Sequence, residues 1–480
     1  MRARGAAGAG VTNRRSFLNG MTLAGAAALT PSSTRAAPSN VRLVQASQGT
    51  GATVPAAPLT VKSVGRLVGS STGCAYAIKA GPWIFLTGHE AFDFERGPAP
   101  EVAGPPGYPL SGRPPLRREA DYILARMRAI LKEFGADLPN AVRVDQYYTK
   151  GAAVSAYHLA RFAEFGSYIP PSTSIIMERC FAAHTNIDTS MIAVVPGPDW
   201  AIEKVTLPGE AITASGYNPA VVANDFVFVA GNMALQRDGT LDPSVHLAPN
   251  RNWGGQTSFR RQVHYVVKQR LEPSLKAAGS GLEHSLKAQV YIRGVENFPD
   301  FLDAWSQHFR EIPCAVTLVP AKDYANSDSM LEINLIALKN GARRRREVVD
   351  TGIPAAATFG PCLRAGELVF PSGLMAIGSD GRVPGVDYAR RFDGLSLAGE
   401  LQGALLLSYM EAVCKAVGVP PSNVVRAQYF LTDMHDFAGI SAAWSDRYGK
   451  RPHPFACVQV PAPFPAAGAC AIADFWIYAG

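Results

Sequence analysis

The chain has 480 residues, of which 47% are hydrophobic and 18% charged, and its formal net charge is +7. This length and apolar content are ample for several packed domains. Residues 1–36 hold five arginines and no acidic residue, so the formal charge falls to +2 without them. A charge this small gives no argument for binding nucleic acid.

The N-terminal segment is typical of a twin-arginine (Tat) export signal. Arg14 and Arg15 precede an acid-free, Gly/Ala-rich stretch over 20–30, and small residues near Ala37 suit a signal peptidase. We therefore assign residues 1–37 to the signal, the alternative being a disordered basic N-terminus. The apolar stretch is too short to span a bilayer permanently. We expect a periplasmic or secreted protein without stable membrane anchoring.

An internal repeat organises the rest of the chain, because three landmarks recur about 140 residues apart. A short apolar run ends in a small residue and a glycine at Gly88, Gly231 and Gly373. A helical segment ends at Gly135, Gly279 and Gly418, and a basic residue opens a strand at Arg143, Lys287 and Arg426. The repeat predicts domains over 63–200, 201–342 and 351–480. It leaves an Ala/Pro/Ser-rich tether over 38–62 and a basic segment over 343–350, interpreted as a solvated linker or, alternatively, a binding patch.

Each copy is predicted to contain strand, strand, helix, strand, helix, strand and strand. In the first copy, apolar residues from Ala120 to Phe134 follow the spacing of a helix with one buried face, which Gly135 ends. Pro273 predicts a kink or early break in this helix of the second copy. The same helix of the third copy is predicted over 401–417. Further strands are predicted over 143–148, 287–292 and 426–431, and shorter helices over 154–165, 298–309 and 437–448. Helices on one face of a mixed sheet define an α+β unit, whose other apolar face needs a cover.

Two stretches of the third copy carry a family resemblance. They are Gln-Tyr-Phe-Leu-Thr-Asp-Met-His-Asp-Phe over 428–437 and His-Pro-Phe-Ala-Cys-Val-Gln-Val over 453–460. Both resemble the signature region of the RidA/YjgF (enamine/imine deaminase) family. The other two copies resemble it more loosely in the same order, so the resemblance covers 63–480.

The resemblance implies three tandem chorismate-mutase-like α+β domains. Members of the family are homotrimers whose sheets face a central barrel, whose helices lie outside and whose active sites lie between subunits. Three fused copies then imply an intramolecular pseudo-trimer with a central β-barrel, outer helices and three unequal clefts. We therefore expect a monomer that binds a small molecule without a cofactor. Cys180 and His184 are a conceivable metal pair, but no second pair lies nearby in the sequence, so we expect no metal.

The family's enzymes grip a substrate carboxylate through an arginine in a Pro-x-Arg-Ser-x-Val pattern, a bidentate contact. The matching positions of this chain hold Ser172, Ala315 and Phe455. All three clefts therefore lack the carboxylate grip. The resemblance places further substrate-binding positions at Gly88, Tyr217, Asn232, Ser372 and Phe437, and Arg293 could contact an anion or form a surface ion pair.

Four polar residues are candidates for catalysis. His89 follows the strand glycine and could transfer a proton near neutral pH, or it could cap a bulge. Glu90 stands beside it. Cys457 could be a nucleophile or a small core residue. Asp474 matches the family's water-positioning glutamate, or it could accept hydrogen bonds from backbone amides.

These residues favour an active cleft built from the first and third copies. We expect an exported hydrolase or deaminase that acts on a C–N bond of a small molecule lacking the α-carboxylate anchor. The alternative is a non-catalytic small-molecule-binding or scaffolding protein with degenerate clefts. Endoribonuclease activity, also associated with the family, is disfavoured by the small net charge and the lack of a basic, aromatic groove.

Overall fold

The computed structural model describes residues 43–44, 59–66, 72–94, 96–207, 215–236, 238–247, 257–325, 328–386 and 398–480. The predicted Tat signal lies outside these ranges, and so does most of the predicted tether. Both stay predictions. Within the described ranges, no helix combines the length and the apolar character that a bilayer crossing requires.

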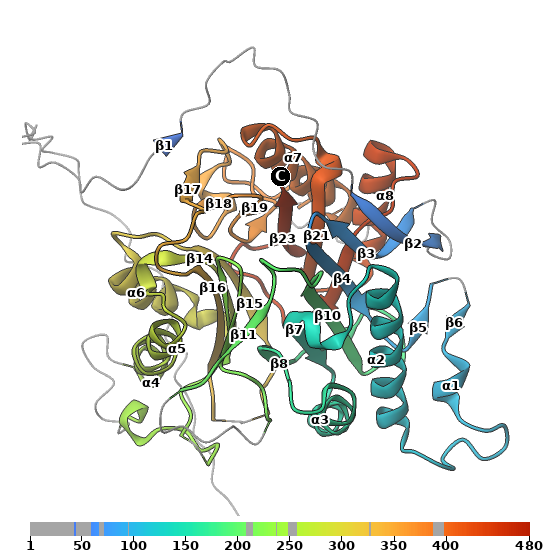
Figure 1. Ribbon diagram of the computed structural model, residues 1–480. Coiled ribbons are helices and arrows are strands. Elements are labelled where there is room, and N and C mark those ends of the chain that lie inside the picture. The colour runs from blue at the N-terminus through green and yellow to red at the C-terminus, as the bar shows by residue number, and fades with distance from the viewer. Residues whose placement is uncertain are drawn as a thin grey trace, which may run out of the picture. The chain divides into compact units, whose positions relative to one another are not determined.

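Three sheets share one strand order (Figure 1). The first runs β2 (Thr60–Arg66), β3 (Gly73–Ala80), β4 (Trp83–His89), β10 (Ile187–Val194), β7 (Ala141–Tyr148) and β8 (Ser172–Ile176). The second runs β11 (Ile202–Val205), β12 (Ala220–Ala223), β13 (Phe226–Asn232), β16 (Leu331–Leu338), β14 (Ser285–Arg293) and β15 (Ala315–Ala321). The third runs β17 (Arg346–Val349), β18 (Cys362–Ala365), β19 (Leu368–Phe370), β23 (Ala471–Tyr478), β21 (Val424–Leu431) and β22 (Phe455–Gln459). In each sheet the last two strands are parallel.

Three short strands join the third sheet, two at its ends and one beside its central strand β23. β1 (Leu43–Val44) pairs with β17, β20 (Leu374–Met375) pairs with β23, and β9 (Arg179–Cys180) pairs with β22. Because β9 belongs to the first repeat, this last pairing joins the first repeat to the third. The strand pairings of the described residues leave the three sheets separate, so the predicted closed barrel is not seen.

Each sheet carries its own pair of helical segments, which stand outside the strands in Figure 1. They are α2 (Pro115–Glu133) with α3 (Gly151–Phe165), α4 (Ser258–Tyr265) and α5 (Glu272–Ala277) with α6 (Phe298–Phe309), and α7 (Ala398–Ala416) with α8 (Asp436–Tyr448). The predicted α+β class is therefore confirmed. A short α1 (Pro100–Ala103) precedes α2.

The predicted break in the second copy is confirmed. A π-helical segment, η4 (Val266–Leu271), separates α4 from α5, and Pro273 lies in the first turn of α5. Proline lacks the N–H of the normal helical bond, so the ladder is interrupted at this point. The copies without a proline there form the continuous helices α2 and α7.

The basic segment over 343–350 differs from the predicted solvated linker. Its second half forms β17, the first strand of the third sheet. The Arg344 guanidinium lies 3.1 Å from the Asp225 carboxylate and 2.7 Å from the Glu367 carboxylate. These carboxylates neutralise a charge that sequence reasoning assigned to solvent. Similarly, β2 begins at Thr60, inside the predicted tether.

Equivalent side chains of the three repeats meet where β7, β14 and β21 approach one another. Arg143 donates to Asp145 at 2.9 Å and to Gln289, while Arg426 donates to Asp145 at 2.6 Å and to Gln428 at 2.8 Å. All five side chains are buried. Hydrogen bonds and opposite charges offset the desolvation that burial imposes on such groups. This polar cluster links all three repeats.

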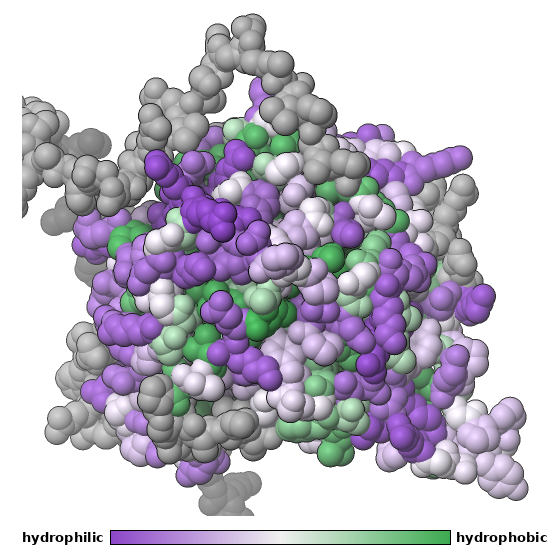
Figure 2. Space-filling view, viewed as in Figure 1, coloured by the Kyte–Doolittle hydropathy of each residue, from purple (hydrophilic) through white to green (hydrophobic). Residues whose placement is uncertain are grey.

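The surface visible in Figure 2 is mostly hydrophilic, with smaller hydrophobic areas between. Exposed large apolar side chains are spread over separate helices, as with Leu159 on α3, Leu302 on α6 and Leu401 on α7. Scattered apolar residues of this kind are normal on a soluble surface.

Candidate functional site

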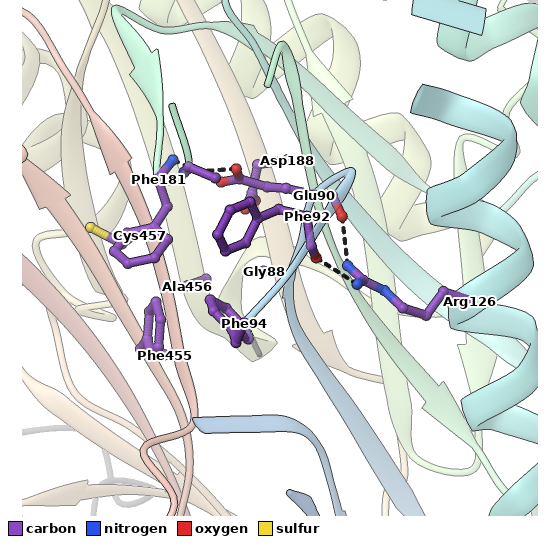
Figure 3. Close-up of a pocket in the computed structure, with 11 residues that line it drawn as sticks. Gly88, Glu90, Phe92, Phe94, Arg126, Phe181, Asp188, Phe455, Ala456 and Cys457 are labelled. Carbon is purple, nitrogen blue, oxygen red and sulfur yellow. Dashed lines mark hydrogen bonds between the residues drawn. The ribbon is translucent and has the colours of Figure 1, made fainter. Parts of the chain in front are cut away.

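A pocket lies between β4 of the first repeat and β22 of the third (Figure 3). Its polar lining residues are Glu90, Arg126, Asp188 and Cys457, its aromatic ones are Phe92, Phe94, Phe181 and Phe455, and its small ones are Gly88, Ala182 and Ala456. The space measures about 280 Å³, including the part open to solvent, and about one water-sized molecule fits wholly inside.

Gly88 allows the two strands to approach at this point. A Cβ atom there would lie 2.7 Å from the Asp188 carboxylate and 3.3 Å from Ala456 on β22. Both distances are shorter than ordinary carbon contacts. The glycine of the first landmark is therefore required by close packing at the pocket floor.

Glu90 follows β4 and turns its carboxylate toward the segment after β9. The carboxylate accepts the backbone N–H of Phe181 at 2.7 Å, the N–H of Ala182 at 2.9 Å and the hydroxyl of Thr185 at 2.6 Å. Burial raises the pKa of Glu90 to about 7, although these donors oppose the shift. Glu90 is thus poised to exchange a proton near neutral pH.

Asp188 on β10 lines the same pocket as Glu90, and the two carboxyl groups are close enough to influence each other's pKa. Asp188 is 1% exposed, and its Oδ1 atom has no hydrogen-bond partner in the described structure. Burial and the neighbouring Glu90 raise the pKa of Asp188 well above its usual range. Two carboxyl groups this close hold one proton between them, as paired catalytic acids do.

Aromatic rings form the opposite end of the pocket, below the carboxyl pair in Figure 3. The Phe455 ring lies 5.7 Å from that of Phe94 and 5.1 Å from that of Phe181. Phe437 on α8 packs behind them, 4.6 Å from Phe455. Phe455, which the sequence resemblance aligns with the family's arginine, thus contributes an apolar ring to the pocket.

Arg126 on α2 fixes the loop that carries Glu90 and Phe92. Its guanidinium donates to the Glu90 carbonyl at 2.6 Å and the Phe92 carbonyl at 2.7 Å. It also lies 4.7 Å from the centre of the Tyr76 ring, a cation–π contact. The arginine thus acts on the backbone of the loop, as Figure 3 shows.

Cys457 lines the same pocket but is 1% exposed, with its sulfur 3.6 Å from the sulfur of Met434. Burial and the carboxyl groups of Asp188 and Glu90 raise the pKa of this thiol well above its usual range. A protonated thiol is a poor nucleophile. Its surroundings suit a packed side chain better than an attacking group.

The structure places the other two catalytic candidates away from this pocket. The Nε2 atom of His89 lies 3.0 Å from the Tyr76 carbonyl, and burial together with Arg126 lowers the His89 pKa well below its usual range. Asp474 lies in the polar cluster, 2.9 Å from the Lys287 ammonium, and accepts from Gln289 at 2.6 Å. His89 and Asp474 therefore do not meet.

The remaining substrate-binding candidates lie at the other two junctions between repeats. Ser172 on β8 accepts from Arg161 at 3.2 Å and donates to the Pro170 carbonyl at 2.9 Å. Asn232 donates to the carbonyl of Ala230, two residues earlier in the same strand. Tyr217 lies close enough to Arg161 to act on that guanidinium electrostatically. These contacts lie on the side of the first repeat that faces the second.

Two candidates lie elsewhere in the second and third repeats. Arg293 lies 3.5 Å from the Asp323 carboxylate. It therefore forms an ion pair, which was the alternative to an anion contact in the sequence analysis. The Ser372 hydroxyl donates to the Pro361 carbonyl at 2.8 Å and accepts from Val316 on β15. Ser372 thus bridges the second and third repeats by backbone contacts.

Sequence reasoning missed Asp188, Arg126 and three of the aromatic lining residues, which are Phe92, Phe94 and Phe181. One signal could have found the first of them. Asp188 is the second residue of β10, Glu332 is the second of β16, and Ile472 is the second of β23. An acid at a position that is apolar in another copy marks a candidate site, because an ionised carboxylate is costly to bury.

The fold and the pocket define an α+β repeat protein with a pocket between two of its repeats. The family model described as Endoribonuclease L-PSP matches residues 209–339 and 351–467, just over half of the chain. The RutC family protein UK114 of Drosophila melanogaster is 30% identical over 123 residues, which are 25% of this chain and 78% of that relative. The chain belongs to this family, the RidA/YjgF family predicted from its sequence.

Solved structures also match parts of the chain. Yeast Mmf1 is 22% identical, covers 29% of this chain and all of its own length, and gives a TM-score of 0.25. A YjgF family member from Neisseria meningitidis is 21% identical, covers 30% of this chain and 99% of its own, and gives a TM-score of 0.23.

Proposed function

We propose that the pocket between β4 and β22 is the active site of a hydrolase or deaminase that cleaves a C–N bond in a small organic molecule. The observation that carries the proposal is the buried pair of Glu90 and Asp188 at the end of an aromatic pocket. Membership of a family associated with imine deamination supports the reaction class. The pair supplies both a base and an acid.

The chemistry balances without a cofactor. The ionised carboxylate of the pair takes a proton from water while the water oxygen bonds to the C=N carbon of the substrate. The carboxylic acid gives its proton to the nitrogen, which leaves a carbinolamine. The acid formed in the first step then protonates the nitrogen while the other carboxylate takes the hydroxyl proton, so that the C–N single bond breaks, a C=O bond forms and the pair returns to its starting state. The products are a carbonyl compound and ammonia or an amine. Positioned proton transfer of this kind contributes about 10²- to 10⁴-fold to rate.

The substrate differs in this proposal from the carboxylate-bearing imines of the family's enzymes. Phe455 stands where an arginine would pair with a carboxylate, and the acid pair would repel an anion. 2-Iminopropionate is therefore expected to turn over slowly.

A second candidate function is small-molecule binding without catalysis. The specific observation that favours it is the narrowness of the pocket, which holds about one water-sized molecule. Under this alternative, the carboxyl pair orients a ligand and does not turn it over.

The finer architecture and the location belong to the same proposal. The common strand order and the polar cluster support an intramolecular pseudo-trimer, which would be monomeric in solution. Light scattering should then give about the mass of one chain, 51.1 kDa before processing. Export to the periplasm or medium rests on the twin-arginine pattern, and replacement of Arg14 and Arg15 by lysine should retain the protein in the cytoplasm.

Ammonia release tests the reaction. The full chain is incubated with small imines and amidines, and ammonia is coupled to NADH consumption by glutamate dehydrogenase. Glu90→Gln should lower the rate at least 100-fold. Release at the wild-type rate from Glu90→Gln would show that the pocket is not the site. No release from any compound would leave the binding alternative.

A further inference from the structure

Resting on the proposed function, we propose that this pocket selects a small planar organic cation of the amidinium class. One N–H of the cation donates to Asp188 Oδ1, and the face of the cation lies against the rings of Phe94 and Phe455. Hydrolysis of such a cation consumes one water, converts the amidinium carbon to an amide and releases ammonium.

The first step is the open acceptor. The Glu90 carboxylate already accepts three hydrogen bonds, from Phe181, Ala182 and Thr185. Asp188 Oδ1 is buried without a partner and belongs to a residue that lines the pocket. Leaving a buried acceptor unmet is costly, and a donor arriving with the ligand removes that cost. The ligand should therefore present an N–H group.

The second step is the charge of the ligand. Two carboxyl groups stand at one end of the pocket, whereas the charge of Arg126 is directed to backbone carbonyls and the Tyr76 ring. Arg426, which opposes the rise that burial and Glu90 cause in the Asp188 pKa, already pairs with Asp145 at 2.6 Å. Neither arginine is thus directed at the carboxyl pair, and a cationic ligand gains where an anion loses.

The third step is the shape of the ligand. Phe94, Phe181 and Phe455 line the pocket with ring centres 5.1 to 6.1 Å apart, in edge-to-face and tilted arrangements. Aromatic faces attract cations, and planar cations stack on them with little loss of contact. The enclosed space holds about one water-sized molecule, so the cation enters only when Phe92, which Figure 3 shows between the two ends, turns aside.

Calorimetric titration with acetamidinium and acetamide tests the selection, because the two have nearly the same shape and differ in charge. At pH 8 the full chain should bind acetamidinium at least tenfold more tightly than acetamide. The double variant Glu90→Gln, Asp188→Asn should abolish that preference, since neither carboxyl group then remains to carry the negative charge. Glu332→Gln, the change at the equivalent of Asp188 in the second repeat, should leave binding unchanged.

Equal affinity for the two compounds, no binding of either, or unchanged selectivity in the double variant would overturn the proposal. Near-UV circular dichroism checks that the double variant is folded. If it is not, Phe94→Leu supplies the test, because loss of the ring should weaken acetamidinium at least threefold and leave acetamide unaffected. Acetamidinium bound but not hydrolysed retains this inference and counts against the proposed function. If the chain releases ammonia from a neutral substrate and does not bind acetamidinium, the proposed function is retained and this inference is overturned.

Discussion

Glu332 occupies in β16 the position that Asp188 occupies in β10, and burial raises its pKa to about 8 from an ordinary value of 4.5. Its Oε1 atom accepts the N–H of Ser174 on β8, while Oε2 lacks a hydrogen-bond partner in the described structure. The folded chain therefore holds a proton that the unfolded chain releases between these two pH values. Stability from this group is present at low pH and is lost as pH rises through about 8.

Replacing Glu332 by glutamine should remove this loss. The variant should match the wild type near pH 5 and exceed it by roughly 2–4 kcal/mol near pH 9. Urea unfolding at both pH values measures the difference, and Glu283→Gln, an exposed change in the same repeat, serves as the control. A difference between variant and wild type that is the same at both pH values would contradict the burial argument.

The sequence identified part of the site at the level of single residues. Gly88, Glu90 and Phe455 were candidates, and the structure brings them together with Cys457. Asp188 escaped because its partner across the pocket is far away in sequence, so neither residue looks paired. His89 was more prominent than Glu90 in the sequence, but its side chain points to the carbonyl of Tyr76. Successive side chains of a strand point to opposite faces of the sheet, and this alternation decides where each one points. Near the end of a strand the alternation can shift, so counting residues in the sequence does not fix the direction of a side chain there.

The loop after β4 and helix α2 form one functional unit at the scale of elements. Arg126 holds the loop through the carbonyls of Glu90 and Phe92, so the carboxyl pair and the Phe92 ring depend on a helix from the same repeat. Backbone anchored by a partly buried side chain is more rigid than a loop held by its own turns.

Replacing Arg126 by methionine should loosen this loop without unfolding α2. Hydrogen exchange should quicken at least tenfold in peptides covering residues 90–94, because two anchoring bonds are lost and local opening costs less. Arg128→Met, which removes a partly exposed arginine of the same helix, should leave these peptides unchanged. Equal protection in Arg126→Met and wild type would show that the loop is held by other contacts.

Helices and strands were the most predictable elements, since periodic apolar residues, Pro273 and the terminal glycines each act locally. Helices predicted over 298–309 and 437–448 are observed within one residue of those bounds as α6 and α8. The segment over 343–350 was not predictable in the same way. Its strand character depends on pairing with β18 and on Asp225 and Glu367, which are distant in sequence.

The polar cluster acts at the scale of the whole molecule, because its members come from all three repeats. Lys287 of the second repeat and Asp474 of the third are both fully buried and lie 2.9 Å apart. Burial lowers the pKa of Lys287, and the adjacent Asp474 opposes that shift. A buried pair of this kind costs much to break, although it need not stabilise the fold overall.

Lys287→Met should destabilise the chain by about 3–5 kcal/mol because it leaves a buried carboxylate without its cation. Adding Asp474→Asn should recover more than half of the loss, since no charge then remains. Urea midpoints of the two single variants and the double variant measure the coupling. A loss below about 1 kcal/mol in Lys287→Met would contradict a structural role for the pair.

The central claim is that one of the three junctions between repeats is the working site. The most direct measurement is kcat/KM for ammonia release from one turned-over substrate in three full-length variants, one at each junction. Glu90→Gln alters the junction of the third and first repeats, Glu332→Gln that of the first and second, and Ser372→Ala that of the second and third. The account predicts a loss of at least 100-fold in Glu90→Gln and less than threefold in the others. A large loss in Glu332→Gln or Ser372→Ala, with Glu90→Gln near the wild-type rate, would contradict it.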